Sequence, residues 1–115
     1  MSSAPHLYDA STRTDLVDWG VQPDALEGAS HSSGRLAHKG PGNRPETGIW
    51  VCTPGRWRLE LPGDELCHFV EGEATYVEDN GEVIEVTPGT LVMFPKGWRG
   101  ECAVHKTMRN VYILF

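Results

Sequence analysis

The sequence lacks a long apolar run and a cluster of basic residues. No apolar stretch approaches the length that spans a bilayer, so we expect no membrane partner. The 10 lysine and arginine residues are scattered, and the formal net charge is -6. Because binding to successive phosphates requires grouped basic side chains, we also expect no nucleic-acid partner. The first residues have no apolar segment after a basic start, so we expect no signal peptide.

The sequence also lacks paired cysteines. Its 3 cysteines, Cys52, Cys67 and Cys102, are odd in number and form no Cys-x-x-Cys motif. Such a set does not suit a disulfide scaffold and is typical of a reducing compartment. We therefore expect a cytoplasmic protein.

Turn-forming residues divide the chain into two parts. The length of 115 residues is that of one domain. Glycine, serine and proline are concentrated between residues 28 and 45, so residues 1–47 are predicted to form an irregular N-terminal extension. Beyond them, short β patterns alternate with turns, and strands are predicted at 49–52, 56–61, 65–70, 74–78, 82–86, 91–94, 99–104 and 108–114. This spacing predicts an all-β sandwich or barrel, with the strongest hairpin signal at Asn80-Gly81.

Two motifs carry a resemblance to a known superfamily. Glu65 is followed by six residues and Gly72, and Gly89 is followed by five residues and Pro95-Lys96-Gly97. This pair resembles the two motifs of the cupins. The resemblance implies an RmlC-like jelly-roll barrel over residues 48–115. We expect residues 1–47 to pack on the barrel and the protein to form a homodimer.

Shorter segments make the resemblance more specific. They are Gly48-Ile49-Trp50, Cys52-Thr53-Pro54-Gly55, Pro62-Gly63-Asp64-Glu65 and Phe94-Pro95-x-Gly97-Trp98. Together they resemble the (S)-ureidoglycine aminohydrolase-type cupins, a group that includes the EutQ proteins and small single-domain proteins of unassigned activity.

The positions at which this resemblance implies metal ligands are mostly occupied by unsuitable residues. Those positions are Arg58, Glu60, Glu65 and Gly100, of which only Glu65 keeps the identity of the family ligand. A guanidinium offers no lone pair to a metal, and glycine has no side chain. We therefore expect neither a metal nor another cofactor.

The orientation of segment 56–61 is open to two interpretations. Its periodicity places Trp57, Leu59 and Leu61 in the core, whereas the register of the resemblance turns Arg58 and Glu60 inward. We favour the second, because charged residues rarely occupy such positions without a site. On the segment after Pro95-x-Gly97, periodicity and resemblance agree that Trp98, Gly100, Cys102 and Val104 face inward.

The predicted site follows from that choice. The ligand-binding residues are predicted to be Arg58, Cys67, Trp98, Cys102, Trp50 and Tyr76. Arg58 would bind a carboxylate, and Glu65 and Glu60 would act as general acid or base. We expect a metal-independent protein that binds or converts a small metabolite bearing a carboxylate, ureido or amine group. The alternatives are a metal-dependent aminohydrolase of the (S)-ureidoglycine type and a non-catalytic accessory or structural cupin, so the sequence does not decide whether the chain is an enzyme.

Overall fold

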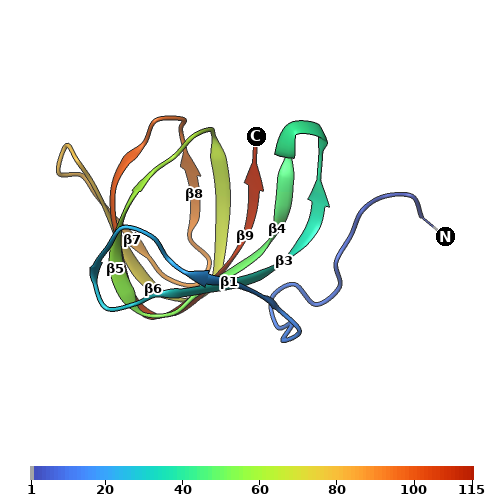
Figure 1. Cartoon of the computed structure of the whole chain (residues 1–115), viewed down its shortest axis with the longest axis horizontal. Helices are drawn as coiled ribbons and strands as arrows, with labels where there is room; N and C mark the ends of the chain where they lie inside the picture. The colour runs from blue at the N-terminus through green and yellow to red at the C-terminus, as the bar shows by residue number, and fades with distance from the viewer. Residues whose placement is uncertain (1) are drawn as a thin grey trace.

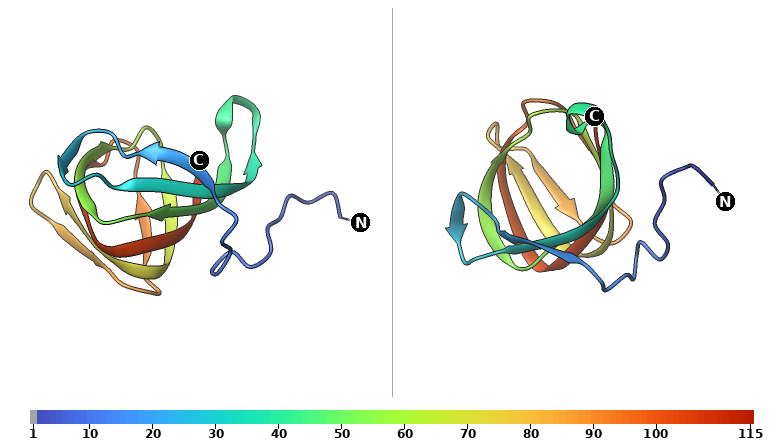
Figure 2. Two further views of the ribbon diagram at one scale, coloured as in Figure 1. Left: turned by 60° about the horizontal axis from the view of Figure 1, so that its bottom comes forward. Right: turned by 45° about the vertical axis from the view of Figure 1, so that its right-hand side comes forward.

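Nine β-strands make up almost all of the regular structure in the computed structural model, which describes residues 2–115. They are β1 (Val17–Val21), β2 (Ala25–Glu27), β3 (His31–Lys39), β4 (Glu46–Cys52), β5 (Gly55–Glu60), β6 (Glu65–Glu78), β7 (Val83–Val86), β8 (Leu91–Phe94) and β9 (Arg99–Leu114). One short 3-10 helix, η1 (Pro41–Asn43), joins β3 to β4. The strands close into a ring, as the right-hand view of Figure 2 shows.

The all-β prediction is confirmed, and each of the eight predicted segments coincides with a strand or part of one, except for residues 61 and 82, which lie just outside β5 and β7. Two pairs of them are fused, because residues 65–78 form the single strand β6 and residues 99–114 form the single strand β9. The N-terminal extension is more regular than predicted: β1 and β3 join one edge of the sheet, and β2 pairs with β5.

The two long strands β6 and β9 form the spine of the barrel. They pair antiparallel along most of their length, with irregularities between Phe69 and Ala74. The C-terminal part of β9 also pairs with β4 and its N-terminal part with β5, while the two ends of β6 pair with β8 and β7. Figure 1 shows how these two strands run through both halves of the curved sheet.

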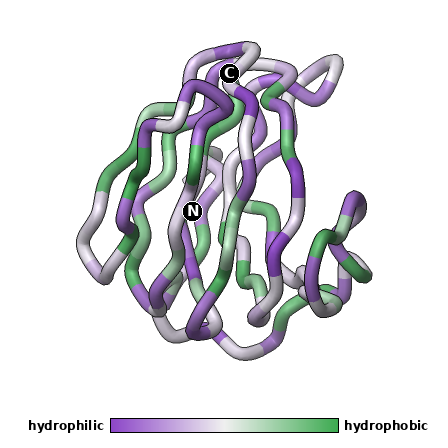
Figure 3. The backbone as a smooth tube through the Cα atoms, turned by 90° about the vertical axis from the view of Figure 1, so that its left-hand side faces the viewer, coloured by the Kyte–Doolittle hydropathy of each residue, from purple (hydrophilic) through white to green (hydrophobic). Residues whose placement is uncertain are grey.

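Alternation along the strands builds the core. Hydrophilic and hydrophobic residues follow one another along the strands in Figure 3, because successive side chains of a strand point to opposite faces. The prediction for residues 98–104 is confirmed, since Trp98, Gly100, Cys102 and Val104 are all buried. These side chains face those of β6, where Cys67, Phe69 and Tyr76 are also buried.

The predicted orientation of β5 is wrong. Trp57 is 3% exposed and Leu61 6%, whereas Arg58 and Glu60 are exposed to solvent. The partners on β9 explain this orientation: Trp57 pairs with the inward residue Cys102, and Arg58 pairs with Glu101. Residues directly opposite in a strand pair share a face, so the apolar set is buried and the desolvation of a guanidinium is avoided.

Part of the N-terminal segment lies against the outer surface of the barrel. The guanidinium of Arg109 on β9, only 9% exposed, donates hydrogen bonds to the backbone oxygens of Ala10 (3.0 Å) and Arg13 (2.8 Å). Arg35 on β3 donates to the backbone oxygen and side chain of Asp15. The residues before this segment extend away from the barrel in Figure 1. Within residues 2–115, no helix has the length and apolarity needed to cross a membrane.

The orientation of β5 predicts opposite effects for two neighbouring substitutions. Trp57→Ala should lower the free energy of unfolding by about 3–5 kcal/mol, because it removes a large side chain from the core. Arg58→Ala should change it little, because an exposed ion pair contributes little to stability. Urea denaturation of both variants tests this. A larger loss in Arg58→Ala than in Trp57→Ala would contradict the observed orientation.

Candidate functional site

A cavity of about 300 Å³ opens into the barrel. Most of its lining is aromatic or aliphatic, including Trp19, Trp50, Trp57, Tyr76 and Phe94. Concave, mainly apolar cavities with a few convergent polar groups are typical of small-molecule sites. The barrel therefore has room for a ligand.

The acidic side chains come from strands that are neighbours in the barrel. Glu46 on β4 pairs with Leu114 on β9, which pairs with Glu65 on β6. The two glutamates thus lie two strands apart, about 10 Å between their backbones, and both line the cavity. Glu60, at the end of β5, lies at the rim and forms an ion pair of 3.3 Å with Arg99.

Glu65 is an acidic group of the cavity whose ionisation is changed by burial. Burial raises the pKa of its carboxyl group, and the nearby charge of Glu46 raises it further. The thiol of Cys67 opposes this shift by donating a hydrogen bond of 3.3 Å to Oε2. This bond also directs the carboxyl group along the strand toward Cys67, into the cavity.

Glu46 is positioned by a tyrosine. The hydroxyl of Tyr112, on β9, donates a hydrogen bond of 2.7 Å to Oε2 of Glu46. Tyr112 is 4% exposed, and burial together with this bond raises the pKa of its hydroxyl, so that the group stays a donor. The hydroxyl thus holds a carboxylate at the cavity wall.

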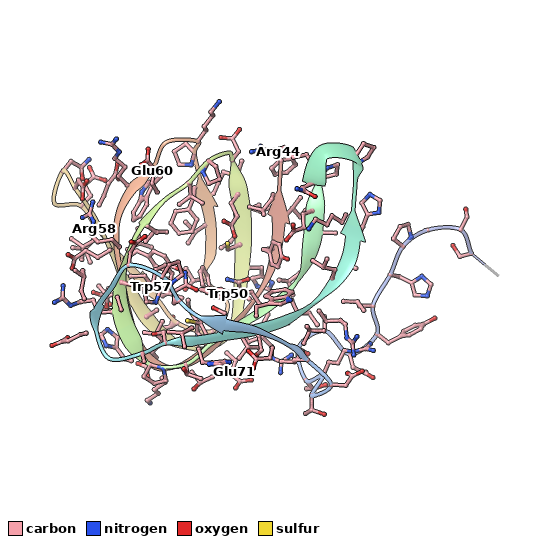
Figure 4. The ribbon with its side chains drawn as sticks, in the orientation of Figure 1. Arg44, Trp50, Trp57, Arg58, Glu60 and Glu71 are labelled. Carbon is pink, nitrogen blue, oxygen red and sulfur yellow. The ribbon has the colours of Figure 1, made fainter. Side chains whose placement is uncertain are left out.

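Aromatic rings form the other walls. Trp50 on β4 and Trp57 on β5 meet edge to face, with their centroids 6.0 Å apart. Figure 4 shows both rings inside the barrel, whereas Arg58 lies at its outer edge. Phe94 and Tyr76 pack against each other with centroids 5.0 Å apart. Such rings offer π faces to a cation as well as apolar contact area.

Asn110 lies on the inner face of β9, between Trp50 and Phe69 on the neighbouring strands. Its side chain is 1% exposed and lines the cavity. Neither its amide oxygen nor its amide nitrogen has a hydrogen-bond partner among residues 2–115. Buried amides are normally paired, so an amide with both its oxygen and its nitrogen unpaired is unusual at a cavity wall.

The structure brings together part of the predicted site. The cavity lining includes Trp50, Cys67 and Tyr76 as well as Glu60 and Glu65. Trp98 and Cys102 are buried in the adjoining core. Arg58 lies outside, where its guanidinium forms hydrogen bonds of 2.7 and 3.0 Å with the carboxylate of Asp79. Its predicted place beside Glu60 and Glu65 in an enclosed interior is therefore wrong.

All three thiols are buried and form no disulfide. Burial raises the pKa of Cys52 to about 11 and that of Cys102 to about 12, and it raises that of Cys67 further. A nucleophilic cysteine requires an accessible thiolate, so none of the three suits that role. Cys52 and Cys102 pack in the core, and Cys67 donates its hydrogen bond to Glu65.

Sequence reasoning missed several residues of the cavity. Glu46 lies before the predicted start of the barrel. The sequence signal that could have indicated it was its position just before the predicted strand 49–52, which in the structure begins at Glu46. Tyr112 and Asn110 lie on the predicted strand 108–114, where alternation places both on one face. Only the pairing of β9 with β4 and β6 brings them beside the glutamates.

The cavity residues do not fit the transition metal that the cupin fold implies. Among residues 2–115, no three His, Cys, Asp or Glu side chains come together in a group that can hold a metal ion. The inward residues of β5 are Trp57 and Leu59, and Leu61 follows directly after the strand; none of the three supplies a ligand atom. We therefore derive no chemistry through a metal.

Comparison with known sequences identifies the family. The profile of the EutQ-like cupin domain matches residues 39–112. This chain belongs to the EutQ-like cupin family. The cupin prediction is thereby confirmed, and the match extends to Lys39, before the boundary expected at residue 48. No curated protein matches this cupin.

Solved structures agree with this assignment. The cupin is similar to a DUF861 family protein of unknown function from Pseudomonas syringae pv. tomato, with a TM-score of 0.80 and 16% identity over 89% of this chain. It spans only 45% of that protein. It is also similar to EutQ from Clostridium difficile, with a TM-score of 0.65 and 18% identity over 80% of this chain and 75% of that one. A DUF861 family protein from Thermotoga maritima has 30% identity and a TM-score of 0.57, covering 58% of this chain and 76% of its own.

The raised pKa of Glu65 predicts a pH-dependent effect on stability. At about pH 8 the carboxyl group is ionised in the unfolded protein, and its raised pKa in the folded protein lowers the stability of the fold. At about pH 4 the group is mostly protonated in both states, so this loss largely disappears. Glu65→Gln should therefore raise the melting temperature relative to wild type more at about pH 8 than at about pH 4.

Glu82→Gln, in the exposed turn between β6 and β7, is the matched control and should behave like wild type at both pH values. Thermal denaturation followed by circular dichroism measures the effect. An equal shift at both pH values in Glu65→Gln would contradict the electrostatic explanation.

Proposed function

We propose that this cupin binds a small metabolite inside the barrel through an amino group or another cationic nitrogen. The observation that carries the proposal is the combination of Glu46 and Glu65 with tryptophan rings in one cavity. None of the described residues that line this cavity is a lysine or an arginine. A cation would therefore meet acceptors and π faces without a competing positive charge.

The energetics favour this ligand class. A buried carboxylate gains from a charge-assisted hydrogen bond to an ammonium group, worth about 1.5–3 kcal/mol. Contact of a cation with the face of Trp50 or Trp57 adds about 0.5–2 kcal/mol. Both gains require a positive charge on the ligand, and both rise as water leaves the cavity.

A ligand recognised by its carboxylate is less well supported. The predicted clamp for such a group was Arg58, which is directed outward and engaged with Asp79. An anion in the cavity would instead approach Glu46 and Glu65, and like charges in a poorly solvated site repel. Of the carboxylate and the amine predicted from the sequence, the amine is thus the one that this cavity suits.

The aminohydrolase of the (S)-ureidoglycine type stays a prediction from sequence resemblance. The homodimer also stays a prediction, as does the cytoplasmic location expected from the cysteine content. An aminohydrolase of this type would need a metal ion, and the inward side chains of β5 supply no ligand for one. Glu65, with its raised pKa, is the group best suited to exchange a proton with a bound amine. We propose binding, and no specific reaction.

Titration with charged and uncharged probes tests the proposal. Propylamine at neutral pH should bind and change the tryptophan fluorescence, whereas propionate and propanol should bind at least about tenfold more weakly, because they lack the positive charge. Calorimetry gives the dissociation constants. Glu65→Gln should weaken propylamine binding by about tenfold or more, and the control Glu82→Gln should not. Equal binding of propionate and propylamine would refute the proposal.

A further inference from the structure

We infer that Asn110 recognises a carboxamide group of the ligand, so that the ligand carries an amine at one end and an amide at the other. The inference rests on the proposed function, since it assigns the second half of the same ligand. It starts from the unpaired polar side chain in the cavity wall.

The surroundings of Asn110 explain why its amide is unpaired. The residues opposite it on β4 and β6 are Trp50 and Phe69, whose rings face the same side of the sheet. Two residues away along β9 lie the inward side chains of Met108 and Tyr112, and the Tyr112 hydroxyl is directed to Glu46. None of these groups pairs with the amide oxygen or nitrogen of Asn110.

An unpaired asparagine is chemically specific. Its side chain offers one acceptor oxygen and two donor hydrogens side by side. A carboxamide presents the complementary set. Its N–H group can donate to the amide oxygen of Asn110, while its oxygen accepts from the amide nitrogen of Asn110. A simple amine satisfies only one half of this pair, and a carboxylate lacks the donor. The cavity wall therefore prefers an amide at this point.

The geometry relates this group to the glutamates. The carboxyl group of Glu65 is directed toward Cys67, which pairs with Tyr112. Asn110 lies two residues further along β9, a step of about 7 Å. A short chain with an amine at one end and a carboxamide at the other spans this distance. The inferred ligand class is thus a small ω-amino amide.

A probe series separates this inference from the proposed function. We compare glycinamide, β-alaninamide and 4-aminobutanamide with propylamine and acetamide by calorimetry on the wild-type protein. At least one amino amide should bind about tenfold or more tightly than propylamine, because it pairs an amide that is otherwise buried without a partner.

Variants then assign the gain to one side chain. Asn110→Leu should abolish the advantage of the amino amide over propylamine. The control Met108→Leu, at the next inward position of β9, should keep the advantage, because it conserves volume in the core. The ligand series on the wild-type protein remains a test even if Asn110→Leu does not fold.

Each outcome is decisive. Tight binding of propylamine with no gain from any amide would overturn the role of Asn110 and leave the proposed function in place. Binding of acetamide that Asn110→Leu abolishes, without binding of propylamine, would support Asn110 and refute the amine proposal. Failure of every probe to bind would refute both.

Discussion

The close antiparallel pairing of β6 and β9 around Gly72 is the constraint on which the barrel depends. Both strands bend where they pass from one half of the sheet to the other, and Gly72 occupies the bend of β6 with φ of 88°. A Cβ atom at this position would lie 2.2 Å from the backbone oxygen of Thr107 on β9. Only glycine accepts both the conformation and the contact. The strands that pair with the two halves of β6 and β9 take their positions from this point.

The sequence predicted most of this architecture because it is encoded locally. Turns with proline and glycine separate the strands, and the spacing from Glu65 to Gly72 marks both an inward carboxylate and the bend. Fusion of the predicted strands into β6 and β9 was not predicted, because a bend and a turn give the same local signal. The predicted orientation of β5 was wrong for another reason. The alternation of polar and apolar residues in β5 correctly indicated which side chains face the core. The alignment with the family motif was shifted by one residue and therefore reversed the predicted orientation. The pairing of β5 with β9 determines the orientation.

The candidate site was only half predictable. Trp50, Glu65, Cys67 and Tyr76 lie on strands whose inward faces follow from alternation, and they do line the cavity. Glu46 and Asn110 enter it through pairings between strands far apart in the sequence, which no local pattern reveals. The resulting cavity is acidic and aromatic. The raised pKa of Glu65 and the unpaired amide of Asn110 arise because the folded barrel brings distant strands together, so no single segment of sequence predicts them.

The attachment of the N-terminal segment has an evolutionary consequence. Both atoms of that segment that accept hydrogen bonds from Arg109 are main-chain carbonyl oxygens, which every amino acid possesses. The side chains at positions 10 and 13 are therefore not specified by this anchorage. At these two positions selection falls on the path and spacing of the chain, so relatives can diverge there in composition while keeping the same course over the barrel, provided that Arg109 persists.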